Sequence, residues 1–283
     1  MSVANFIPTI WSETLYEGLV GQCVAVKNCN REFEGDIAGI GSEVKIVGIG
    51  DVNIQNYTPN STIGDPDILS DSVRSMSIDH ARYFNFMIDD VNRVQASPKL
   101  MGAALRNAAR GLANVADKEV LALHADAANT IDVTEATETN MLNPFIEARN
   151  ILYKNNVTDS SEVVFEVSPD IAARLFKDKM ELLSNNNELV ENGCLGSIMG
   201  CKVYVSGNVA VETENGNVYH RCIARTKRAI AFAQQLSKIE AYRPEGFFAD
   251  AVKGLYLYGM KVVYPNEMVR INVNMGASSD AVQ

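Results

Sequence analysis

Residues 97–128 read SPKLMGAALRNAARGLANVADKEVLALHADAA, and this stretch decides how the rest of the chain is interpreted. Ser97 can cap a helix and Pro98 suits the first helical position, so the sequence predicts a helix that begins there. Apolar residues then recur every three or four positions through Val115, which predicts one buried stripe. At about 1.5 Å per residue, roughly 30 residues span about 45 Å.

The segment before this helix, residues 35–90, has the pattern of short strands joined by turns. Glycines interrupt its short aliphatic runs, and Gly64-Asp65-Pro66 adds a turn signal. From Arg31 to Asp90 there are eleven acids and only four bases. A two-stranded hairpin alone is marginally stable in water, so we expect this acidic flap to find its partner elsewhere. We also expect that removing residues 36–77 leaves a folded core.

The flanking regions complete the outline. Residues 1–34 are interpreted as an arm, in which Trp11, Leu15 and Leu19 follow the spacing of one helix face. Beyond the long helix, helix and strand patterns alternate. The expected elements are a helix over 143–155, a strand over Val163–Val167, a helix from Ser168-Pro169, a loop over 193–200 that leads into a strand over 202–206, a hairpin turning at Asn215-Gly216, and a β-rich return over 247–273.

Composition sets broad limits on function. The chain has 283 residues, 47% hydrophobic and 21% charged, which is typical of globular proteins. The formal net charge of -10 argues against a dedicated nucleic-acid-binding protein, which usually carries a basic surplus. Five cysteines, at C-x5-C and C-x6-C spacings, match no zinc or redox motif, so reduced thiols are expected. No transmembrane run and no signal peptide are recognised.

No catalytic constellation, cofactor site or metal site is predicted. Residues 193–200, GCLGSIMG, lack the G-x-G-x-x-G spacing of a dinucleotide loop and precede a strand, so a structural turn is expected. His80, His124 and His220 are scattered, without a metal-binding pair on one helix. Asp89-Asp90 are neighbours on a strand and point to opposite faces, so they do not share an acid–base site.

One charged pattern on the long helix has two interpretations. Lys99, Arg106 and Arg110 lie at i, i+7 and i+11, which places them on one face. This face is either an ordinary solvated surface or a surface turned toward a polyanion such as nucleic acid. The residues alone leave both interpretations open.

In the order of its parts, the chain resembles the Hong Kong 97 fold of tailed-phage major capsid proteins. Residues 41–52 (GSEVKIVGIGDV) and 78–91 (IDHARYFNFMIDDV) are similar to the two edges of that family's E-loop. Residues 229–235 (AIAFAQQ) and 248–265 (FADAVKGLYLYGMKVVYP) are similar to its closing segments. The resemblance covers essentially the whole chain and rests on the order of the parts more than on any one motif.

The resemblance implies an α+β fold with a particular domain plan. Residues 1–34 would be the N-terminal arm and residues 35–90 the extended E-loop. The peripheral domain, with the long spine helix, would comprise residues 91–140 and 225–283, and the axial domain residues 141–224. The crosslinking lysine of one branch of the family is not carried over, because Lys45 is the only lysine in the expected E-loop and its partner cannot be identified.

The resemblance also implies a function, which is not enzymatic. Hexamers and pentamers of the chain would form an icosahedral shell around double-stranded DNA, in a virion assembled in the cytoplasm of a bacterial host. The spine helix would face inward, so Lys99, Arg106 and Arg110 would contact DNA phosphates without sequence specificity. A separate scaffolding protein is expected because no long helical segment precedes the arm, and a portal and decoration proteins are further expected partners, with no membrane partner and no cofactor.

Two alternatives remain at this level. The same fold is used by encapsulin-like compartments, which hold enzyme cargo in place of DNA. A nucleotide-binding enzyme built around residues 193–200 is the alternative from another class, and the loop spacing counts against it.

Overall fold

The computed structural model describes residues 15–16, 18–19, 23–34, 37, 39–49, 59, 71–89, 99–134, 141–180 and 194–277. Its strands are β1 (Glu43–Ile49), β2 (Asp71–Ser77), β3 (His80–Asp89), β4 (Asn129–Val133), β5 (Val163–Val167), β6 (Cys194–Ile198), β7 (Cys201–Val205), β8 (Val211–Glu214), β9 (Asn217–Thr226), β10 (Ile230–Tyr242), β11 (Ala249–Val262) and β12 (Met268–Ala277). Its helices are α3 (Lys99–Ala122), α4 (Asn143–Lys154) and α5 (Pro169–Met180), with short 3-10 turns η1 (Val26–Asn28), η3 (Leu123–Asp126), η5 (Lys227–Ala229) and η6 (Pro265–Glu267).

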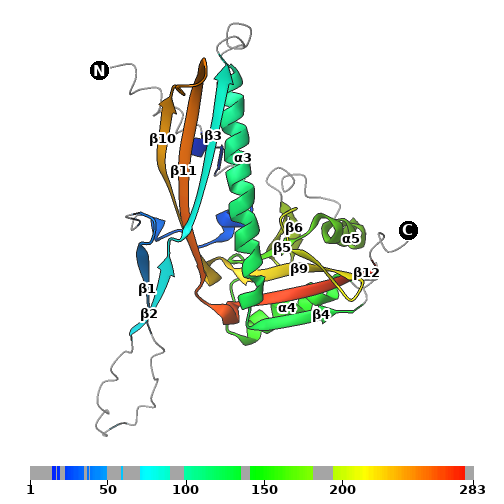
Figure 1. The fold of residues 1–283 in the computed structure, drawn as a ribbon. Coiled ribbons are helices and arrows are strands. Elements are labelled where there is room, and N and C mark those ends of the chain that lie inside the picture. Colours follow the sequence, from blue (N-terminus) through cyan, green and yellow to red (C-terminus); the bar gives the residue numbers. More distant parts are fainter. Residues whose placement is uncertain are drawn as a thin grey trace.

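The long helix is present as predicted. Helix α3 has 24 residues and continues into the 3-10 turn η3, whereas the expected cap at Ser97-Pro98 lies outside the described residues. Leu105, Ala109, Leu112, Ala116 and Val120 form its buried stripe, whereas Val115, which was expected in the stripe, is 37% exposed. Figure 1 shows α3 running beside the long strands β3 and β11. The stripe therefore packs the helix onto a sheet, as its spacing indicates.

That sheet has three antiparallel strands in the order β10-β11-β3. The prediction that residues 78–91 form the second edge of the flap is wrong, because β3 pairs with β11 along its whole length. The pairing depends on a close fit: a Cβ on Gly254 would lie 2.4 Å from the ring of Phe84, directly across the ladder. A glycine is thus required where the aromatic side chain crosses β11.

The flap itself is the hairpin of β1 and β2, which pair only with each other within the described residues. In Figure 1 the hairpin extends away from the rest of the chain. Its base is nevertheless part of the fold, because a second apolar cluster buries flap residues against the sheet; that cluster includes Val44, Ile46, Met76, Ile78, Ala231, Ala233, Leu257 and Val263. The expectation that the flap lacks a partner in its own chain is therefore wrong for its base.

The remaining strands form one mixed sheet in the order β4-β12-β9-β5-β7-β6, with β8 paired to β9. Helix α4 packs against β12, β4 and β9, and Figure 1 shows α5 in the same part of the chain. The Asn215-Gly216 turn between β8 and β9 is confirmed, with φ angles of 52° and 82° that fit a type I′ hairpin. The sheet combines strands from both expected domains, and the domain boundaries stay a prediction.

Candidate functional site

A buried ion pair fixes the root of the N-terminal segment to the mixed sheet. Arg225 on β9 donates from Nε and Nη2 to the carboxylate of Glu166 on β5, at 3.0 and 2.9 Å. The same guanidinium donates to the carbonyl oxygens of Asn28 (2.7 Å) and Ala25 (3.0 Å). Both charged side chains are fully buried. A pair this deep is maintained only because nearly every donor and acceptor is used.

Helix α3 holds the same segment from the other side. Asp117 accepts hydrogen bonds from the backbone N–H groups of Val24 (2.7 Å) and Val26 (3.0 Å). Asp117 lies seven residues, or two turns, after Arg110, so the segment covers α3 beyond the exposed residues Arg106 and Arg110. Residues 23–30 are thus clamped between α3 and the sheet by charged groups from both.

Burial raises the pKa of Asp117 to about 6, from an ordinary value of 3.8, although its backbone hydrogen bonds oppose the shift. Because the folded-state pKa lies above the unfolded one, the stability contributed by this group grows as pH falls through 6 and is lost as pH rises through 6. We expect the parent to gain about 1 kcal/mol relative to Asp117→Asn between pH 7 and pH 5. Urea titrations of both proteins at the two pH values measure this difference, and a constant difference contradicts the prediction.

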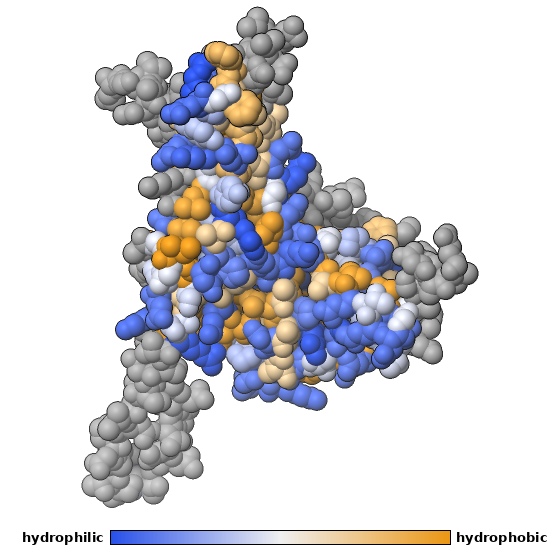
Figure 2. Space-filling view, in the orientation of Figure 1, coloured by the Kyte–Doolittle hydropathy of each residue, from blue (hydrophilic) through white to orange (hydrophobic). Residues whose placement is uncertain are grey.

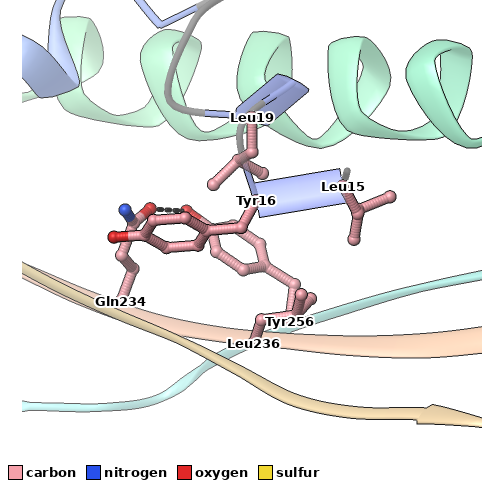
Figure 3. A pocket seen from close by; sticks show the side chains of 6 residues that line it. All are labelled: Leu15, Tyr16, Leu19, Gln234, Leu236 and Tyr256. Atoms are coloured by element: carbon pink, nitrogen blue, oxygen red, sulfur yellow. Dashed lines mark hydrogen bonds between the residues drawn. The ribbon is translucent and has the colours of Figure 1, made fainter. Parts of the chain in front are cut away.

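Further toward the N-terminus, apolar side chains anchor the arm on the three-stranded sheet. Leu15 and Leu19 are buried against β10 and β11, and Tyr16 lies beside them. Figure 3 shows these side chains above Gln234 and Tyr256, whose hydroxyl donates to the Gln234 amide oxygen at 2.6 Å. Leu15, Tyr16 and Leu19 are therefore packed onto the sheet of their own chain.

Exposed aromatic residues lie on the three-stranded sheet, both at its β10–β11 turn and along β3. Phe247 and Phe248, in the turn between β10 and β11, are 60% and 84% exposed, and Tyr83 on β3 is 78% exposed. Figure 2 shows apolar residues along this long part of the chain as well as on the mixed sheet. Exposed aromatic side chains of this size are typical of surfaces that a partner covers.

The basic face is only partly described. Lys99 begins α3, but its side chain lies outside the described residues. Arg106 and Arg110 are exposed, and neither makes an ion pair within the part of the chain that the structure describes. Their contact with DNA stays a prediction.

His80 and His220 take part in structural contacts. His80 stacks on Tyr258 and lies 3.1 Å from Glu119 of α3. His220 Nδ1 lies 2.6 Å from the Ser168 hydroxyl, with Asp170 at 3.9 Å from its other ring nitrogen. This set has the residue types of a hydrolase triad, but Ser168 is 2% exposed and its hydroxyl accepts the Ile171 N–H at the start of α5. A substrate cannot reach a hydroxyl buried in this way.

The glycine-containing stretch at 193–200 is not a phosphate loop. Residues 194–198 form β6, an antiparallel partner of β7, so the expected loop is partly a strand. Met199 and Gly200, with φ angles of 50° and 80°, make the tight turn between the two strands. A dinucleotide loop needs a helix after the turn, and β7 follows here. The expected structural turn is confirmed. Residues 193–200 therefore give no support to the hypothesis of a nucleotide-binding site.

Other chemistry finds no support in the described residues. No group of acidic, cysteine or histidine side chains among them is arranged to hold a metal, and none of their helices is long and apolar enough to cross a membrane. Burial raises the pKa of the Cys23 and Cys222 thiols to about 12 and that of Cys29 to about 11. These cysteines are therefore unreactive thiols.

Known structures share this fold. A chain from Mycobacterium phage Che8 aligns with a TM-score of 0.68 at 24% identity, covering 88% of this chain and 91% of that one. The capsid of Ralstonia phage GP4 aligns with a TM-score of 0.66 at 12% identity, covering 92% and 91%. The chain has a phage capsid fold. The predicted α+β fold of the Hong Kong 97 type is thereby confirmed.

The capsid fold is not confined to phages. A virus-like particle from Pyrococcus furiosus aligns with a TM-score of 0.56 at 13% identity, covering 94% of this chain and 99% of that one. No protein-family model and no curated protein matches the sequence.

Proposed function

We propose that this chain is the major capsid protein of a tailed phage, which assembles into an icosahedral shell around double-stranded DNA. The observation that carries the proposal is the capsid fold, which extends over about nine-tenths of the chain in both phage comparisons. The likeness lies in the fold and not in the sequence, since the identities are 24% and 12%, and this fold is that of a phage capsid. The activity of such a protein is assembly, not catalysis.

The shape of the subunit supports assembly. The β1–β2 hairpin has a buried base and no third strand within the described residues, so a ribbon of two strands projects without support from its own chain. Phe247 and Phe248 add exposed apolar surface. In the proposed shell, the hairpin and the arm lie across neighbouring subunits of hexamers and pentamers. Expected partners are a scaffolding protein, a portal, decoration proteins and packaged DNA, in a virion assembled in the bacterial cytoplasm.

Electron microscopy and sedimentation of the purified protein, produced with its scaffolding protein, test the proposal. Closed shells or capsomers are expected. A compact monomer at all concentrations under these conditions would contradict it.

A compartment for cargo proteins is the less favoured second candidate. The likeness to the virus-like particle from Pyrococcus furiosus motivates it, although that TM-score is below those of the phage comparisons. The content of purified particles separates the two: nucleic acid supports the capsid, and an enclosed protein supports the compartment.

The basic face of α3 gives a prediction about the packaged DNA. Replacing Lys99, Arg106 and Arg110 with glutamine should leave empty shells intact and weaken the retention of DNA. Each lost phosphate contact removes about 0.9 from the slope of log affinity against log salt, so loss of all three removes nearly 3. DNA binding to the inner surface, measured between about 50 and 200 mM salt, reports the slope.

The control removes the same charge elsewhere. Lys154, Lys202 and Lys227 are exposed and lie outside α3, so their replacement with glutamine should leave DNA retention unchanged. Equal behaviour of both triple variants would mean that the face on α3 is only solvated.

A further inference from the structure

A polar pocket of about 490 Å³ opens on the mixed sheet, where strands β4, β8, β9 and β12 meet the turn η3. The residues that matter for its chemistry are His124, Asp132, Glu212, Arg221, Arg270 and Asn272. This volume is within the range of ligand sites, roughly 300–1,000 Å³. Neither the capsid fold nor the buried clamp explains why so many charged side chains gather here.

Most of these charges are satisfied within the chain. Arg221 donates to Glu212 at 2.8 Å and also to Glu214, and its own side chain is 8% exposed. Asn272 donates from Nδ2 to Asp132 at 2.6 Å. The three carboxylates of the pocket therefore already have donors.

Arg270 is the exception. Its Nε is buried and has no hydrogen-bond partner, and no ion pair or hydrogen bond joins its guanidinium to any other described residue. Two neighbouring side chains share this condition: Nδ1 of His124 and Oδ1 of Asn272 are unpartnered, in side chains that are 7% and 4% exposed. In contrast, Nε, Nη1 and Nη2 of the buried Arg225 each donate a hydrogen bond to an acceptor in the chain. Nε of Arg270 is a donor and Oδ1 of Asn272 is an acceptor, so the two atoms require different partners, and the unpaired guanidinium of Arg270 is the group that indicates an anionic occupant.

The unpaired guanidinium defines the chemistry of that occupant. Arginine binds oxyanions, and carboxylate and phosphate match its donors best. A phosphate carries close to two negative charges, and Asp132, Glu212 and Glu214 would repel it. A carboxylate carries one negative charge, so this repulsion is smaller. A cation would meet the unpaired charge of Arg270 itself. A single carboxylate therefore fits the pocket best.

We infer that the Arg270 pocket receives a carboxylate side chain from a second copy of this chain. The inference rests on the proposed function, because a shell places copies side by side. Charge complementarity supports it: the chain has 35 acids against 25 lysines and arginines, and eleven of the acids lie between residues 31 and 90. In a shell of this protein, carboxylates are the anions that surround Arg270. The contact fixes how neighbouring subunits meet, because truncating one member of a buried charge pair weakens association strongly.

Three variants test the inference in the full chain. Arg270→Glu should raise the subunit concentration needed for assembly at least about tenfold, because two carboxylates then oppose each other, and Arg270→Gln should raise it less. Lys202→Glu, an equal charge change at an exposed position of the same sheet, should assemble like the parent. Circular dichroism must show the secondary-structure content of the parent in each variant that is compared. If Arg270→Glu does not fold, Arg270→Gln alone tests the inference.

The outcomes separate this inference from the proposed function. Absence of shells from the parent protein would overturn the proposed function and the inference with it. Shells from the parent and equally good shells from both Arg270 variants would overturn the inference alone. If inorganic phosphate or acetate raises the melting temperature of unassembled parent but not of Arg270→Gln, while assembly is unchanged, the pocket is a small-anion site and the inference is also wrong.

Discussion

Replacing Arg225 with alanine is expected to destabilise the folded subunit by about 3–5 kcal/mol. The change leaves the carboxylate of Glu166 fully buried without its guanidinium, and the carbonyl oxygens of Ala25 and Asn28 lose their charged donor. An unpaired buried charge is far less stable than either the pair or an apolar replacement of it. Denaturant unfolding of the unassembled subunit measures the loss.

An exposed ion pair provides the matched control. Lys253 and Glu240 are 2.9 Å apart, and each side chain is 51% exposed. Solvent screens such a pair, so Lys253→Ala should change stability by less than about 1 kcal/mol. The double variant Arg225→Met, Glu166→Met removes both buried charges and should recover part of the loss. Equal losses for Arg225→Ala and Lys253→Ala would show that the buried pair does not hold residues 23–30.

Shortening the hairpin is expected to abolish shells while the subunit stays folded. Residues 47–73 are removed and Ile46 is joined to Arg74, its partner across the ladder, by Asn-Gly, which favours a two-residue hairpin turn. The buried residues of the base are kept, so the circular dichroism spectrum and melting temperature should match the parent. Sedimentation should show subunits or capsomers only.

Complete removal of residues 36–77 is a different experiment. It would uncover Ala231, Ala233 and Leu257 on the sheet, which the hairpin base now buries. We therefore expect lower stability from this deletion, in contrast to the expectation from the sequence alone. Closed shells from the shortened-hairpin variant would show that the projecting part of the flap is not needed for assembly.

The elements that the sequence predicts correctly are those determined by residues close together in the chain. Local patterns were sufficient for α3, α4, β5 and the Asn215-Gly216 turn, because spacing, caps and turn residues act within a few positions. The sequence does not predict the partner of β3, because residues 78–91 have the strand pattern expected of a second E-loop edge beside residues 41–52. The true partner, β11, lies more than 160 residues later, and the fit of Phe84 over Gly254 has no local signal.

The buried clamp was missed, although the sequence contains a hint. Glu166 is the only charged residue in the strand VVFEV, and Arg225 is the only charged residue in the stretch CIAR, residues 222–225. A single charge in a buried strand needs a buried partner. Register was needed to connect them: Glu166 lies opposite Ile223, which makes Arg225 its diagonal neighbour. Asp117 gave no such hint, because Lys118 and Glu119 follow it directly and the three residues read as a solvated stretch of α3.

The clamp also determines how late during synthesis the N-terminal segment can reach its folded position. Arg225 bonds to Ala25 and Asn28 across separations of 200 and 197 residues. At about 5–20 residues per second, a ribosome needs roughly 10–40 s to add that many residues. The root of the arm therefore cannot take its final place until most of the polypeptide has emerged. Under the proposed function, a subunit still under synthesis cannot join a shell with residues 23–30 in their final place.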